Sequence, residues 1–379
     1  MKILNNNGII FKGIQTQTRA LTFRVPGKSS SMIVGKLTES GTKKNLTNIG
    51  YRIVKNGKTI EEHSYENKYG FSSRRLEELS QNVERKVKDG YSFLKELIAT
   101  RTRGESLMLD QHIHGAFGVD FNKAEAEEIS NVADKLYERG IGAIFPTLVT
   151  DSVENIKRQI ERIKEAAKYN SRILGIHLEG IIINEKKKGI HNPKHFMELT
   201  PENYQLMEDD FIKIVTLAPE LDKGLIDYLH SKGVKVQAGH RLGADLSNID
   251  GVTHTFNAQG EVTHRGKSTA LSALTNDHVF AEIIADGKHV SDEALKLFFK
   301  SKPLDKVVLI SDALPITDSD LKQAVFADSI IRYDGKMAKS MDGTIAGSTM
   351  LLDKVVQRLK DVGLFKPEYI DKPWLYHKI

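Results

Sequence analysis

From residue 106 onward the chain alternates short runs of β-branched residues with longer amphipathic segments, and this alternation constrains the fold more than any other feature. Eight of the short runs have the length and composition of strands. They are Ser106–Gln111, Gly142–Leu148, Arg172–His177, Phe211–Leu217, Val234–Ala238, Gly251–Thr255, Val279–Ala285 and Val307–Ser311. Helices are predicted over Lys123–Glu138, Val153–Ala167, Leu221–Ser231 and Asp292–Lys300, with Asp151 and Ser152 as a cap before the second.

Strands that alternate with helices are predicted to run parallel, because a parallel return needs a crossover connection. Eight such units over roughly two hundred residues favour a closed (β/α)8 barrel of the TIM type. An open doubly wound sheet is the rival fold, but the chain has no glycine-rich dinucleotide fingerprint to favour it. Few residues separate His240 from His254, so one barrel helix is expected to be reduced to a turn.

The first hundred-odd residues have a different character from the rest. Residues 1–60 are rich in Asn, Gly, Lys, Ser and Thr, and Asn56-Gly57 lies between two strand-like runs as a hairpin turn signal. Residues 73–101 carry apolar side chains at helical spacing. We therefore expect a small β-rich region ending in a helix over residues 1–105, a barrel domain over 106–360 and a tail over 361–379.

Composition narrows the classes of function. The chain of 379 residues has no cysteine, which excludes a disulfide framework, a thiolate nucleophile and any cysteine-built zinc site. Its formal charge of +5 is small, so a nucleic-acid partner is not expected. Residues 1–15 lack the apolar core of a signal peptide, and no apolar run has the length of a membrane span. We expect a cytoplasmic enzyme or binding protein.

Reactive side chains follow the predicted strands, at the end where barrel active sites form. They are His112, His114, Glu179, His240, His254 and Asp312. A single histidine at a strand end is more often a hydrogen-bonded structural residue than a ligand. Their coincidence at five strand ends instead favours a metal centre, and imidazole with carboxylate suits Zn²⁺ or Fe²⁺. Asp312, on the last strand, is our candidate for a proton carrier beside a metal-activated water.

With those residues in place, the chain resembles the N-acetylglucosamine-6-phosphate deacetylase family of the metal-dependent amidohydrolase superfamily. The resemblance spans about residues 105–360 and implies a deformed barrel with a small β-domain. It is carried, in the family's order, by HIHGAFGVD from His112, FPTLVT from Phe145, GIHLEG from Gly175, KGIH from Lys188, AGH from Ala238, THTFNA from Thr253, His264-Arg265, IADGKHV from Ile284, Ser311–Ala313 and GTIAGS from Gly343.

The resemblance also implies roles for single residues. Glu179, His240 and His254 match the ligands of the principal metal ion, and the His-x-His pair matches a second ion that some members hold. The expected cofactor is thus one or two divalent ions per chain, zinc or iron. Asp312 matches the catalytic carboxylate, which acts first as base and then as acid. His289 matches the histidine that polarises the acetamide carbonyl.

Substrate contacts carry over in the same way. The matching positions are Ile190, His191, Asn257, Ala258, His264, Arg265, Ile345, Ala346 and Gly347. Arg265 matches the phosphate ligand, and a guanidinium fork suits a phosphate dianion. In some members a neighbouring subunit supplies that arginine, so a homodimer is expected.

The implied activity is hydrolysis of N-acetyl-D-glucosamine 6-phosphate to glucosamine 6-phosphate and acetate by metal-bound hydroxide. Two alternatives stay open at this point. Altered residues around Arg265 allow another N-acyl substrate, such as N-acetylgalactosamine 6-phosphate or an N-acyl amino acid. The unusual amino-terminal region allows a catalytically dead relative that binds phosphosugars, although the complete set of ligand residues argues against it.

Overall fold

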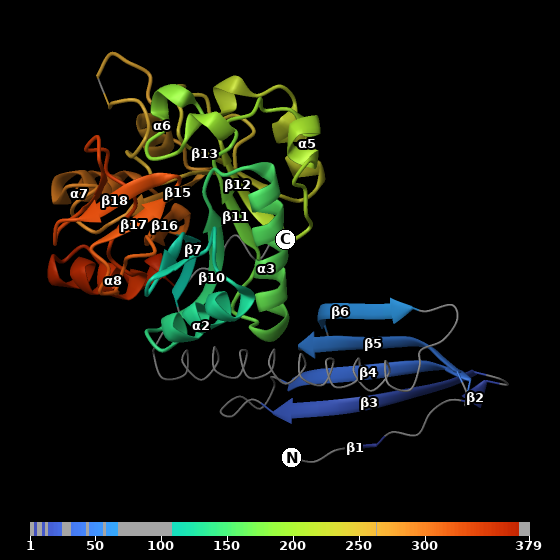
Figure 1. The fold of residues 1–379 in the computed structure, drawn as a ribbon. Helices are drawn as coiled ribbons and strands as arrows, with labels where there is room; N and C mark the ends of the chain where they lie inside the picture. The colour runs from blue at the N-terminus through green and yellow to red at the C-terminus, as the bar shows by residue number, and fades with distance from the viewer. Residues whose placement is uncertain are drawn as a thin grey trace. The chain divides into compact units, whose positions relative to one another are not determined.

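The computed structural model describes the backbone of six strands between residues 4 and 66, and residues 108–262 and 264–370 in full. Contacts between Cα atoms divide the chain into two compact units, Met1–Glu105 and Ser106–Ile379. Figure 1 shows both units, coloured from blue at the amino terminus to red at the carboxyl terminus. Along the described residues, no helix combines the length and apolar character needed to cross a membrane.

The amino-terminal unit contains one antiparallel sheet with the strand order β1-β3-β4-β5-β6, and β2 pairs with β3. Lys55 lies opposite Lys58, so β5 and β6 form the hairpin that the intervening Asn-Gly predicts. The predicted helix over residues 73–101 lies outside the described residues. The strands are β1 (Leu4–Asn5), β2 (Ile10–Phe11), β3 (Ile14–Arg24), β4 (Met32–Thr42), β5 (Asn45–Lys55) and β6 (Lys58–Glu66).

The second unit is built around eight parallel strands that follow one another in chain order around a single sheet. This confirms the predicted barrel. Its side chains are almost all buried, as expected for strands covered on both faces. The strands are β7 (Met108–Ile113), β10 (Ile141–Leu148), β11 (Ile176–Glu179), β12 (Ile212–Leu217), β13 (Lys235–Ala238), β14 (Gly251–Val252), β15 (Phe280–Ile284) and β16 (Val307–Ile310).

The barrel closes where the segment just past β16 meets β7. The backbone N–H of Asp312 donates to the carbonyl of His112 at 2.8 Å, and the N–H of His114 donates to the carbonyl of Ala313 at 2.9 Å. Ile113 and Ala313 form an isolated parallel bridge at the same place. The seam of the barrel therefore runs through three residues that the sequence singled out for chemistry.

Helices connect the strands and cover the outside of the barrel (Figure 1). The longest is α3, where Ile156, Ile160 and Ile163 form a buried stripe and the Ser152 hydroxyl accepts from the N–H of Asn155 as the predicted cap. The helices are α2 (Ala126–Tyr137), α3 (Val153–Tyr169), α4 (Pro201–Gln205), α5 (Leu225–Ser231), α6 (Thr269–Thr275), α7 (Asp292–Ser301) and α8 (Leu352–Asp361). Within residues 239–250 no helix forms, in agreement with the predicted turn.

Two strand boundaries differ from the prediction by more than two residues. The third strand begins at Ile176 rather than Arg172, and the sixth ends at Val252 rather than Thr255. The sixth ends early because the chain turns at His254, whose φ of 28° lies in the left-handed region. A small antiparallel sheet that the sequence analysis did not anticipate follows the last barrel strand. It contains β17 (Gln323–Phe326), β18 (Ser329–Tyr333) and β19 (Ala338–Ser340).

Candidate active site

Glu179, the last residue of β11, lies at the centre of a buried cluster of imidazoles. Its Oε1 atom is 3.2 Å from His240 Nε2 and 3.0 Å from His254 Nε2. Its Oε2 atom is 3.3 Å from His112 Nε2 and 3.2 Å from His114 Nε2. The carboxylate is only 2% exposed, so these imidazoles are its principal surroundings. One carboxylate thus faces two separate pairs of nitrogen ligands.

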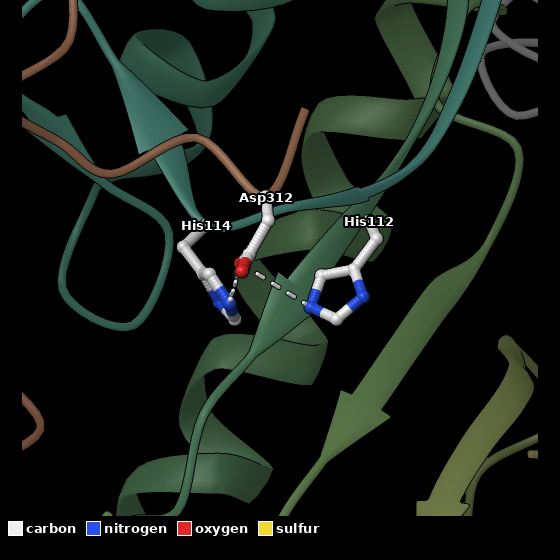
Figure 2. Close-up of side chains that lie close together, drawn as sticks. All are labelled: His112, His114 and Asp312. Carbon is white, nitrogen blue, oxygen red and sulfur yellow. Dashed lines mark ion pairs between the residues drawn. The ribbon is translucent and has the colours of Figure 1, made fainter. Parts of the chain in front are cut away.

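Asp312 completes the second pair. Its Oδ1 atom is 3.1 Å from His114 Nε2 and 3.5 Å from His112 Nε2. Figure 2 shows both imidazoles turned toward this carboxylate, as strand alternation predicts for positions 112 and 114. The structure thus brings together, from five strand ends, all six side chains that the sequence singled out.

Three of these residues have a backbone conformation that is rare for side chains of their kind. His240, His254 and Asp312 have φ values of 48°, 28° and 50°. Each follows the end of a barrel strand, where a left-handed residue turns the chain sharply. Non-glycine residues in this region cost free energy and concentrate at functional sites. The strain supports a functional rather than a structural role for the cluster.

Four histidines are oriented in the same way. In each, Nδ1 faces an acceptor in the surrounding protein while Nε2 points into the cluster. For His114, His240 and His254 the acceptors are the carbonyls of residues 147, 187 and 257, at 3.2, 2.9 and 3.2 Å. For His112 the acceptor is a carboxylate oxygen of Glu282, at 3.0 Å. A proton on Nδ1 leaves Nε2 available to a metal ion, and this orientation is typical of metal-binding histidines.

The spacing of the ligand atoms fits a divalent ion. Glu179 Oε1, His240 Nε2 and His254 Nε2 form a triangle with sides of 3.0, 3.1 and 3.2 Å. Two ligands of a tetrahedral zinc ion lie about 3.3 Å apart, given Zn–N bonds of about 2.0–2.1 Å. His112, His114 and Asp312 form a second group whose ligand atoms lie within 4.8 Å of one another. The residues present therefore fit a divalent metal ion.

Burial and charge act against each other within the cluster. Burial alone would raise the pKa of Glu179, but the charge of His112 and hydrogen bonds from several imidazoles hold that pKa well below its usual value. Burial alone would lower the pKa of His114, but hydrogen bonds to Asp312 and Glu179 raise it to about 9. The carboxylates therefore stay ionised and provide negative charge to a bound cation.

His289 lies just past β15, beside the cluster rather than within it. Its Nδ1 is 2.8 Å from Asp286 Oδ2 and its Nε2 is 3.0 Å from the carbonyl of Ala346. Both ring nitrogens face acceptors, so the imidazolium form satisfies both. The Ile345–Gly347 segment reaches Asp312 as well, because a Cβ on Gly347 would lie only 2.5 Å from the Asp312 carbonyl. The structure thus brings His289, Asp312 and this segment together.

His191 approaches the cluster from the other side, with Nε2 3.8 Å from Glu179 Oε2. Its Nδ1 is 2.7 Å from the hydroxyl of Thr150, which itself accepts from the N–H of Ile181 at 2.8 Å. Thr150 thus holds the ring with Nε2 directed toward the site. Burial and the charge of His240 hold the pKa of His191 well below its usual value. The imidazole is therefore neutral.

The remaining predicted contacts surround the cluster more loosely. Ile190 lines a pocket of about 300 Å³ with Lys188, Gly189 and Asp342 among its walls. Gly189 lies against His240, since a Cβ there would be 3.3 Å from that ring, so the pocket adjoins the cluster. Asn257 and Ala258 are half-buried in the turn after His254.

His264 and Arg265 are exposed, as are residues 261, 262, 266 and 267. The structure places them outside the buried ligand cluster.

The sequence analysis missed a group of residues beneath the ligands. Glu282 is the most prominent: a charged residue inside an otherwise apolar strand run, which is the signal that could have revealed it. Asp286, whose carboxylate pairs with His289, belongs to the IADGKHV stretch, but the sequence predicted no role for it. The others are Gln111, His177 and Gln237, all buried in the barrel interior.

A parallel barrel with buried imidazoles and carboxylates at the carboxyl ends of its strands defines a metal-dependent barrel hydrolase. Over 275 residues the chain is 30% identical to the N-acetylglucosamine-6-phosphate deacetylase of Bacillus subtilis strain 168, covering 67% of this chain and 69% of that enzyme. The chain belongs to the N-acetylglucosamine-6-phosphate deacetylase family, whose members are hydrolases that act on amide bonds.

Two further comparisons agree with this assignment. The chain is 28% identical over 269 residues to the N-acetylgalactosamine-6-phosphate deacetylase of Escherichia coli O157:H7, covering 67% of this chain and 71% of the relative. The crystal structure of N-acetylglucosamine-6-phosphate deacetylase from Thermotoga maritima matches with a TM-score of 0.63 and 26% identity, covering 69% of this chain and 74% of that one. No protein-family model matches the chain.

Proposed function

We propose that the chain is a metal-dependent deacetylase that hydrolyses N-acetyl-D-glucosamine 6-phosphate to glucosamine 6-phosphate and acetate. The observation that carries the proposal is the Glu179 carboxylate with different imidazoles on its two oxygens, opposite Asp312. Together with membership of the family, this arrangement supports both the reaction type and the class of substrate.

The metal would be held chiefly by Glu179, His240 and His254, with His112 and His114 as ligands of a second ion. When bound, a divalent ion lowers the pKa of a water ligand to near 7 and polarises a carbonyl. Zinc is the ion we propose, with iron as the alternative, because imidazole and carboxylate suit both. One or two ions per chain are consistent with the two ligand groups.

Asp312 and His289 would move and stabilise charge. Asp312 accepts the proton of the attacking water and then delivers it to the departing amine nitrogen as the C–N bond breaks. His289, charged and held by Asp286, donates a hydrogen bond to the developing oxyanion of the acetamide. To do so its Nε2–H shares or leaves the carbonyl of Ala346, which it contacts at 3.0 Å.

Substrate recognition would extend outward from the cluster. His191 donates through Nε2, and Ile190, Asn257, Ala258 and the Ile345–Gly347 segment surround the sugar. His264 and Arg265 would bind the phosphate. Their exposed position supports a homodimer in which this loop completes the partner's site. A phosphorylated sugar does not cross membranes unaided, so we place the enzyme in the cytoplasm.

Acetate release tests the proposal. The protein is treated with a chelator, reloaded with Zn²⁺ or Fe²⁺, and assayed on N-acetylglucosamine 6-phosphate, its unphosphorylated parent and an N-acetyl amino acid. We expect turnover of the phosphosugar only after reloading. A His278→Ala variant, which alters an exposed histidine before the amino end of β15, serves as the control and keeps full activity.

Two results would contradict the proposal. Binding of the phosphosugar without hydrolysis in metal-loaded protein would indicate a catalytically dead relative. Faster turnover of unphosphorylated compounds would exclude the role of Arg265.

N-acetylgalactosamine 6-phosphate is the second candidate substrate, because the Escherichia coli relative is named for it. It differs from the first only at one hydroxyl of the ring. The same assay with both sugars decides between them by the ratio of their kcat/KM values.

A further inference from the structure

Glu282 is an unusual residue for its place in the fold. It lies in β15 among Phe280, Ala281, Ile283 and Ile284, and its side chain is 1% exposed in the barrel interior. A buried carboxylate is costly unless it is fully hydrogen-bonded. Nothing in the roles assigned above accounts for a charge at this position.

Four donors satisfy the Glu282 carboxylate. Oε1 accepts from Gln111 Nε2 at 2.5 Å and from Gln237 Nε2 at 3.0 Å. Oε2 faces His112 Nδ1 at 3.0 Å and the backbone N–H of His254 at 3.3 Å. The carboxylate therefore has one fixed orientation and contacts a ligand residue from each half of the metal centre.

The contact with His112 determines where that imidazole carries its proton. An ionised carboxylate can only accept, so the proton lies on Nδ1. The Nε2 atom is then directed at Glu179 Oε2 and Asp312 Oδ1, at 3.3 and 3.5 Å. These two carboxylates pair with the imidazole. A divalent ion bound at the same place would use Nε2 as a ligand.

His112 also differs from the other three ligand histidines. Their Nδ1 atoms are held by backbone carbonyls, which no side-chain substitution removes. Only His112 is held by a side chain. The orientation of this one ligand can therefore be altered without touching the others.

We propose that Glu282 is the positioning residue that orients His112 as a ligand of the metal centre. The inference rests on the proposed function, because it concerns the same metal centre. In this proposal Glu282 contacts neither substrate nor ion. It acts through the imidazole, as carboxylates behind metal-binding histidines do in general.

The Glu282→Gln variant tests the inference. The glutamine amide has nearly the same shape as the carboxylate, but one of its two acceptor oxygens is replaced by an NH₂ donor. This NH₂ group must face either His112 Nδ1 or the two glutamine side chains, which are donors themselves. One of the original hydrogen bonds is therefore lost. We expect two ions per wild-type chain by elemental analysis. In the variant, chelator competition with Zn²⁺ should show the second ion bound about 10-fold to 100-fold more weakly, with the first unchanged.

The matched control is Asp250→Asn. Asp250 is also a partly buried carboxylate that contacts an imidazole, His230 Nε2 at 2.9 Å, but it lies before β14, at the opposite end of the strand from His254. This variant loses a comparable contact and should still bind two ions. If it loses the second ion too, general loosening of the barrel explains the effect and the inference is wrong.

A double substitution separates positioning from mere packing. In a His112→Asn background, adding Glu282→Gln should weaken metal binding no further, because the residue through which Glu282 acts is absent. Additive losses would overturn the inference. If the Glu282→Gln chain does not fold, nitrogen NMR of the zinc-loaded wild type decides instead: the proton of His112 must lie on Nδ1.

The outcome is independent of the assay of function. Metal binding is measured without substrate, and acetate release is measured with it. A wild-type chain that releases acetate with a single bound ion at saturating zinc would refute this inference and leave the proposed function standing.

Discussion

The ligand cluster and the loop that carries Arg265 are built in opposite ways. Glu179 and its imidazoles come from the ends of packed strands, are buried, and have each ligand atom directed by a contact behind it. Residues 261, 262 and 264–267 are exposed. The comparison separates two tasks: the barrel holds the reactive side chains in place, and the recognition of the phosphate that we propose belongs to a surface segment.

The sharpest way to test this comparison is to remove the centre of the cluster. Glu179→Ala takes away the carboxylate shared by both ligand groups, so we expect loss of bound metal. Turnover should fall by more than the roughly 10²–10⁴-fold that one proton-transfer group contributes. Elemental analysis and acetate release measure the two effects. Glu185→Ala, which alters an exposed residue of the following loop, is the control and should change neither.

Asp312→Asn removes the proposed proton carrier and keeps the ligands of the principal ion. The principal ligands Glu179, His240 and His254 are intact in this variant, so the first ion stays bound. Without a proton carrier, kcat should fall by about 10²–10⁴-fold. Asp318→Asn, which alters a carboxylate paired with Arg139 and Lys354, is the control. Undiminished kcat in the Asp312 variant would refute the assignment.

Arg265→Ala addresses the exposed side of the comparison. Loss of a charged hydrogen bond to phosphate should raise KM for the phosphosugar by roughly 10-fold to 100-fold and leave kcat and the metal content unchanged. KM for the unphosphorylated sugar should not move. Lys267→Ala removes a neighbouring exposed cation as the control. Equal KM values in wild type and variant would make Arg265 a surface charge with no role in binding.

The smallest predicted effect concerns pH. Burial alone would lower the pKa of His289, but the hydrogen bond that its ring donates to the Asp286 carboxylate raises it. The protonated imidazole is therefore present at low pH and is lost as pH rises through the raised pKa. The pKa of Asp286 is held at about 2, so this carboxylate stays charged across the working range.

Asp286→Asn removes that charge, and the alkaline limb of kcat/KM against pH should move to lower pH. Asp292→Asn, which alters an acid paired with Arg358 instead, should leave the profile in place. If the alkaline limb of kcat/KM lies at the same pH in the Asp286 variant as in the wild type, His289 does not act in its protonated form.

The barrel and the ligand side chains could be predicted because both depend on local pattern. Five of the eight strands are apolar runs that contain a reactive residue at their end or are followed by one within two residues, so His240 and Asp312 could be placed at strand ends without knowledge of the register. The small sheet was harder. Its first hairpin turns through Ala327 and Asp328, both at positive φ, and neither is the Asn or Gly that normally signals such a turn.

Glu282 illustrates what sequence patterns do not contain. Its partner Gln111 is 171 residues away, on a strand that meets β15 only across the interior of the closed barrel. The tilt and stagger of the strands determine which interior side chains face one another. The order of residues within a single strand does not determine this tilt or stagger. The roles of His289 and Arg265 stay predictions for a related reason: the structure gives their positions, and only a bound substrate shows what they touch.

The seam of the barrel has a consequence for synthesis. A nascent chain presents His112 and His114 early, yet the backbone hydrogen bonds that link them to Asp312 and Ala313 form only after the final barrel strand has left the ribosome. Until then the amino-terminal ligands lack their opposing carboxylate. Maturation of the centre and completion of the fold are therefore one event, and a prematurely terminated polypeptide has no latent catalytic activity to misdirect.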